Sequence, residues 1–132
     1  MAAISHWIQR ANFETTEHGP ADAAEAVRVF ERHDWRGELN DYAELERTGT
    51  ECCPPGIGFV APNGEILHIC PDAHQSAQVH YHLNAPSTLL RIIPIKVPRV
   101  ETREGVHRST VAELIHYFFE GRRDAILRVL GP

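Results

Sequence analysis

Apolar and polar residues alternate with a period of two in residues 66–70 and again in residues 78–83. Such alternation is typical of β-strands that have one face on a core and the other face turned outward. The odd positions carry Leu67, Ile69, Val79, Tyr81 and Leu83. The even positions carry His68, Cys70, Gln78, His80 and His82. The pattern therefore predicts a hairpin with an apolar core face and a second face rich in histidine.

Shorter runs of the same kind predict the remaining strands. Residues 7–15 read as a first strand, with a short N-terminal helix as the alternative, and residues 57–61 as a strand before a Pro-Asn-Gly-Glu turn. Residues 89–97 are β-rich in composition, but Pro94 and the following Pro98 cannot donate backbone hydrogen bonds, which favours the edge of a sheet. We expect an antiparallel meander of four to five strands, over residues 7–15, 57–61, 66–70, 78–83 and 89–97.

Helical periodicity dominates the two ends of the chain. Ala23, Ala26, Val27 and Phe30 follow the i, i+3, i+4, i+7 spacing of a buried helix face. Asp34 is a suitable cap for a second helix, and Thr110 to Glu113 form a capping box that opens a third. The predicted helices span residues 20–33, 36–47, 110–120 and 124–130. With helices packed mainly on one sheet face, the prediction is a single α+β domain over residues 1–132.

Charge divides the chain into two unlike halves. The net charge is −5, yet residues 14–51 hold eleven acids and four arginines, whereas residues 91–132 hold eight basic and five acidic residues. An acidic chain is poorly suited to neutralising phosphates, so we expect no nucleic-acid partner. No apolar run approaches the roughly 20 residues needed to span a bilayer, and no secretory signal is evident, so we expect no membrane partner and a cytoplasmic location.

The acidic half suggests a basic protein partner. Glu38, Asp41 and Glu44 recur every three residues along the second predicted helix, where they could meet positive charge on another protein. The simpler alternative is a solvated helix face. The edge strand over residues 89–97 is a second candidate contact, through which two copies of the chain could associate.

The histidine-rich face is the candidate metal site. If Cys70 lies opposite His80 in the hairpin, His68 lies opposite His82, and directly opposed Cβ atoms are about 5 Å apart. Four N and S donors of this kind suit tetrahedral zinc, or three suit a catalytic zinc with an open position. The spacing matches no zinc finger, knuckle or ribbon, so the alternative is a set of surface histidines, and no cofactor is otherwise expected.

The chain lacks the common catalytic motifs: G-x-S-x-G, H-E-x-x-H, a Walker loop and G-x-G-x-x-G are all absent. We therefore expect a small soluble binding or inhibitory module that acts through protein–protein contacts, a profile that a toxin-neutralising immunity protein would share. The alternative is a small zinc-dependent enzyme with its active site on the histidine and cysteine face.

Overall fold

A computed structural model describes residues 4–19, 22–73, 75–89 and 93–131, with side chains described outside residue 73 and residues 85–97. The strands are β1 (Ser5–Gln9), β2 (Thr15–His18), β3 (Gly56–Val60), β4 (Ile66–Ala73), β5 (Ser76–Leu89) and β6 (Ile93–His107). The helices are α1 (Ala23–Arg32), α2 (Trp35–Arg47), α3 (Arg108–Phe119) and α4 (Arg123–Leu130).

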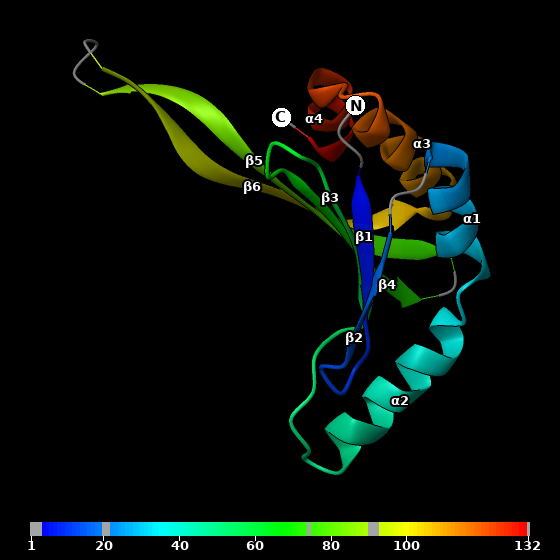
Figure 1. Cartoon of the computed structure of the whole chain (residues 1–132). Coiled ribbons are helices and arrows are strands. Elements are labelled where there is room, and N and C mark those ends of the chain that lie inside the picture. Colours follow the sequence, from blue (N-terminus) through cyan, green and yellow to red (C-terminus); the bar gives the residue numbers. More distant parts are fainter. Residues whose placement is uncertain (1–3, 20–21, 74, 90–92, 132) are drawn as a thin grey trace.

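The strands form one antiparallel sheet in the order β2-β1-β3-β4-β5-β6. The α+β class is confirmed, but the sheet has six strands rather than four or five. Helices α1, α3 and α4 cover one face, and no helix in the described part of the chain covers the other (Figure 1). The predicted strand over residues 89–97 is wrong as a single strand, because Leu89 ends β5, Ile93 begins β6, and residues 90–92 lie outside the described residues. Strand β6, which holds residues 93–97, does lie at one end of the sheet.

The core lies between the sheet and these helices. The odd residues of the two predicted strands face it, and Leu67, Ile69 and Val79 are fully buried there. Two residues of α3, Leu114 and Ile115, meet them from the helical side and are equally buried. The alternation read from the sequence therefore identifies the covered face correctly.

The first predicted strand, residues 7–15, is wrong as a single strand, because the chain reverses within it. Strand β1 ends at Gln9 and β2 begins at Thr15. Between them the Asn12 side chain accepts a hydrogen bond from the backbone of Glu14, and Phe13 has a φ of +72°. Asparagine favours turns because its short side chain bonds to nearby backbone in this way.

The helix starts also differ from the expected ones. Helix α1 is capped by Asp22, whose Oδ1 accepts from the backbone N–H of Glu25 at 2.8 Å; residues 20–21, expected to open it, lie outside the described residues. Helix α3 begins two residues before the predicted capping box, with His107 rather than Thr110 as its cap. Asp34 caps α2 as predicted, since it accepts from Gly37 at 3.0 Å.

Strands β5 and β6 run past the end of β4 and project from the body as a two-stranded arm (Figure 1). Three prolines lie in this arm, and the register pairs them as Pro86 with Lys96, Pro94 with Thr88, and Pro98 with Asn84. Antiparallel pairs alternate between those that exchange both backbone hydrogen bonds and those that exchange none. All three prolines therefore belong to pairs of the same kind. If these are the pairs that exchange no backbone hydrogen bonds, the missing N–H groups of the prolines leave every hydrogen bond between β5 and β6 intact.

Candidate functional site

Helix α2 stands at the lower end of the molecule, below α1 and away from α3 and α4 (Figure 1). Only Trp35 and Glu38 of this helix are buried. Trp35 anchors its first turn, because the indole Nε1 donates to the backbone carbonyl of Phe30 at 2.7 Å. The rest of α2 is therefore available to solvent or to a partner.

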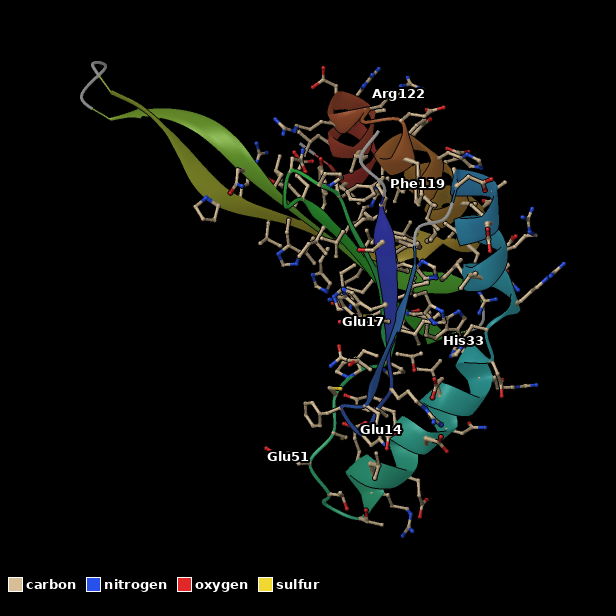
Figure 2. All side chains as sticks on the ribbon, viewed as in Figure 1. Glu14, Glu17, His33, Glu51, Phe119 and Arg122 are labelled. Atoms are coloured by element: carbon tan, nitrogen blue, oxygen red, sulfur yellow. The ribbon has the colours of Figure 1, made fainter. Side chains whose placement is uncertain are left out.

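Acidic side chains gather around this helix. Glu14, Glu17 and Glu51 project from the lower half of the molecule, whereas Arg122 lies at the opposite end beside α4 (Figure 2). We call the lower region the acidic lobe: the β1–β2 turn and β2, helix α2 and the loop that follows it. Its exposed acids are Glu14, Glu17, Asp34, Asp41, Glu44, Glu46 and Glu51. The separation of charge expected from the sequence is thus a separation in space.

The structure places Glu38 inside the protein rather than on the surface of the lobe. Its side chain is 7% exposed and its two oxygens contact different neighbours: Arg10 Nε at 3.3 Å and His33 Nε2 at 2.8 Å. Buried carboxylates persist where such partners satisfy them. Glu38 therefore ties the end of β1 to the start of α2 and does not present its charge to a partner.

Asp41 and Glu44 lie on the surface of α2. Their side chains are 64% and 61% exposed. Asp41 lies 3.9 Å from Arg10, and Glu44 forms an ion pair with Arg47, whose guanidinium lowers the pKa of that carboxyl. Both residues remain accessible to a cation on another molecule.

A groove runs between the β1–β2 turn and α2. It holds a cavity of about 240 Å³, and Glu38, Asp41 and Glu44 all contribute to its wall. Ala11 and Leu45 add apolar surface, and Arg10 also lines the groove. The three acidic residues proposed from the sequence as partner contacts therefore line one depression, which we call the acidic groove.

The uncovered side of the sheet, the open face, carries the histidine-rich set. The central row of paired residues is Trp7, Gly58, His68, His80 and Thr102. The adjacent row is Ser5, Val60, Ile66, His82 and Val100. The expected pairing of Cys70 with His80 and of His68 with His82 is wrong. In the structure His68 lies opposite His80, Cys70 lies opposite Gln78, and His82 lies opposite Ile66.

Two glycines of β3 allow bulky side chains of neighbouring strands to lie flat on the open face. A Cβ at Gly58 would fall 2.2 Å from a ring carbon of Trp7, and one at Gly56 would fall 3.0 Å from both Cys70 Sγ and His68 Nε2. The Trp7 ring lies beside that of His68, with centroids 5.1 Å apart. Glycine is required at both positions because neighbouring atoms occupy the space of a side chain.

The imidazole of His68 and the thiol of Cys70 lie 3.5 Å apart. Burial, aided by His80 and His82, lowers the pKa of His68 to about 4, and burial raises the pKa of Cys70 to about 11. Both groups are therefore neutral at pH 7. A nucleophilic cysteine needs the opposite arrangement, a thiolate stabilised by positive charge.

The four residues of the candidate metal site, His68, Cys70, His80 and His82, share the open face but do not form a ligand set. His80 Nδ1 instead contacts the hydroxyl of Thr102 at 2.9 Å. Across the described residues no three His, Cys, Asp or Glu side chains are placed to hold a metal ion. Zinc needs three or four donors around one point, and this arrangement does not supply them.

Sequence reasoning missed Arg10, His33 and Trp7. Arg10 and His33 act through Glu38, from segments 28 and 5 residues away, and neither has a local signal for that contact. For Trp7 there was a local signal in the sequence. Two glycines at alternate positions of a strand, Gly56 and Gly58, indicate that a neighbouring side chain crosses above them.

Comparison with protein-family models, with curated proteins and with solved structures finds no match for this chain. Among the helices that the structure describes, none has the length and apolar character needed to cross a membrane.

Proposed function

We propose that this protein is a small binding module that acts through protein–protein contact and receives a basic segment of its partner in the acidic groove. The observation that carries the proposal is the groove itself, where Asp41 and Glu44 stay exposed at the edge of a depression that also offers the apolar surface of Leu45. A partner with a lysine or arginine next to an apolar residue would match both properties.

The electrostatics favour rapid and specific association with a basic protein. Asp41 and Glu44 lie within an acidic lobe, so a positive partner is attracted before contact is made. The fixed Arg10–Glu38–His33 contacts hold the groove walls in place and reduce the ordering that binding requires. By covering a basic surface, such a module would act as an inhibitor, the role of an immunity protein.

The three cysteines are unpaired, which suits the reducing cytoplasm expected for such a module.

The test uses charge reversal at the exposed acids. Asp41→Lys with Glu44→Lys should abolish capture of a basic protein from lysate of the cells that make this chain, as measured by quantitative mass spectrometry. The matched control is Glu31→Lys with Glu113→Lys, which changes net charge equally at exposed sites outside the groove. The control should retain the partner.

The kinetics of the captured partner give the second readout. Reversal in the groove should slow association and weaken its dependence on salt, because the charges responsible for steering are removed. Equal capture by both double variants, or capture that never depends on salt, would overturn the proposal.

A further inference from the structure

We propose that the edge strand β2 is a pH-sensitive element, which protonation of His6 releases from the sheet in mildly acidic solution. The observation that carries the proposal is the burial of His6 without any hydrogen bond within the described part of the chain. This imidazole lies on the covered face, in the row that Phe59, Leu67 and Tyr81 continue, and it is 5% exposed.

Neither ring nitrogen of His6 has a partner. Nδ1 and Nε2 are both shielded from water, and neither forms a hydrogen bond to the residues that the structure describes. A neutral imidazole has one N–H donor and one acceptor, so each unpaired atom already costs free energy. A protonated ring would bury two unpaired N–H groups and a positive charge, which costs far more. The closed position of β2 therefore requires the neutral form of His6.

The ring of His18 on β2 shields His6 from solvent. The two histidines are paired across β1 and β2, and their rings stack nearly parallel with centroids 4.7 Å apart. Phe59 of β3 lies beside His6 from the other neighbouring strand, with ring centroids 5.9 Å apart. Because His18 is itself exposed, movement of β2 away from β1 brings water to His6.

Among the described residues, no charged group is placed to compensate a proton on His6. Glu25, in the first turn of α1, is the acid near the ring, but its side chain is exposed and forms no ion pair with either histidine. Strand β3 contributes Phe59, and α3 brings Phe119 next to it, and neither carries a charge. Burial and then the proximity of His18 lower the pKa of His6, and Glu25 opposes them to a smaller extent.

Strand β2 is held weakly. It has four residues, all exposed, and pairs only with β1 at the edge of the sheet (Figure 1). A cavity of about 620 Å³ lies beside it, lined by Thr16 and His18 of β2 and by His33 and Asp34 of the α1–α2 connection. The strand therefore has space to move, and short exposed segments of this kind open locally at a small part of the cost of global unfolding.

The direction of the pH effect follows from these contacts. The closed form holds His6 at a lowered pKa, and opening returns the pKa to a value near 6.5, so the open form binds the additional proton. The stability of the closed form is therefore fully present above about pH 6.5 and is lost as the pH falls below that value. The equilibrium constant for opening should rise about tenfold for each further pH unit, until the closed form is itself protonated.

Opening of β2 also affects the acidic groove. Arg10, Ala11 and Asn12, from the turn between β1 and β2, form one of its walls. A basic partner in the groove should therefore be held less tightly in acid, a consequence that rests on the proposed function. The movement of β2 itself does not, and it is measured without a partner.

The experiment measures amide hydrogen exchange by NMR on the full chain between about pH 7.5 and pH 5, with each rate expressed as protection relative to an unfolded peptide at the same pH. Protection of the amides that join β1 to β2 should fall by up to about 30-fold across this range. His6→Phe keeps an aromatic ring against His18 but takes up no proton, so it should largely remove this dependence. His6→Leu should do the same, and it covers the case in which the larger ring of phenylalanine does not fit.

His68→Gln is the matched control, because it removes a second histidine whose pKa is lowered by burial, on the opposite face of the sheet. Opening of β2 leaves His68 in place, so the pH dependence of the β1–β2 amides should persist in this variant. Circular dichroism should show all three variants folded. The proposal is overturned if these amides show no pH dependence in the unaltered chain, or if both His6 variants keep it in full. Loss of the dependence in His68→Gln alone overturns it as well.

Discussion

The two faces of the sheet are built by alternate residues of the same strands, yet they differ in kind. On the covered face Ile69 and Val79 are fully buried among apolar neighbours. On the open face the next residues along the chain, His68 and His80, contact rings and hydroxyls and remain partly exposed. Apolar burial is thus concentrated on the covered face.

The largest expected effect tests the covered face. Ile69→Ala should lower the free energy of unfolding by about 2–5 kcal/mol, because it loses buried apolar contact and leaves a cavity. Urea denaturation measures the loss. A change below about 1 kcal/mol would mean that the covered face contributes no more to the free energy of unfolding than the open face does.

The free energy of unfolding should depend on pH through His68 of the open face. The pKa of His68 is about 4 in the fold, against 6.5 in the unfolded chain, so between these values the unfolded chain binds the additional proton. Stability should be fully present above pH 6.5 and fall as the pH drops toward 4, by at most about 3 kcal/mol from this residue. His68→Gln should flatten that part of the stability profile, and identical profiles would contradict the assignment.

Crowding above β3 gives a smaller effect. Gly58→Ala should cost about 1–3 kcal/mol, because the new methyl group collides with the Trp7 ring and forces it to move. Thermal unfolding should show the loss, and adding Trp7→Ala should recover part of it. Gly19→Ala is the control, since a Cβ there meets nothing within 4 Å. Equal effects at the two glycines would contradict the close approach.

The smallest effect belongs to the outer histidine of the open face. His82→Ala should change stability by no more than about 0.5 kcal/mol, because His82 is only half-buried and surface side chains away from special contacts contribute little. A loss as large as that of Ile69→Ala would show that His82 is a structural residue.

Period-two alternation predicted the covered face and the hairpin from local sequence, since side-chain direction in a strand follows position alone. The β1–β2 reversal was missed because Asn12 and Phe13 interrupt a run that otherwise reads as one strand. The start of α3 was missed because His107, a less common cap, lies ahead of a conventional capping box. In the first case a turn signal competes with strand alternation, and in the second case two residues compete as the helix cap.

The sequence placed Glu38, Asp41 and Glu44 on the second helix, and all three lie on α2. Burial of Glu38 could not be foreseen, because it depends on Arg10, which comes from a distant strand. The relative position of His68 and His82 was missed for a related reason: register depends on the bend of the Pro71–Ala77 connection, not on alternation.

The prolines of the β5–β6 arm affect the tendency of the protein to aggregate at high concentration. An arm of this kind has two open edges, each a template onto which another strand could add. If the prolines belong to the pairs that exchange no hydrogen bonds, their nitrogens point outward, away from the partner strand. Pro86 then removes one N–H donor from the outer edge of β5, and Pro94 and Pro98 remove two from the outer edge of β6. Growth of a continuous sheet would be interrupted on both sides, so the arm can extend into solvent without seeding fibrils.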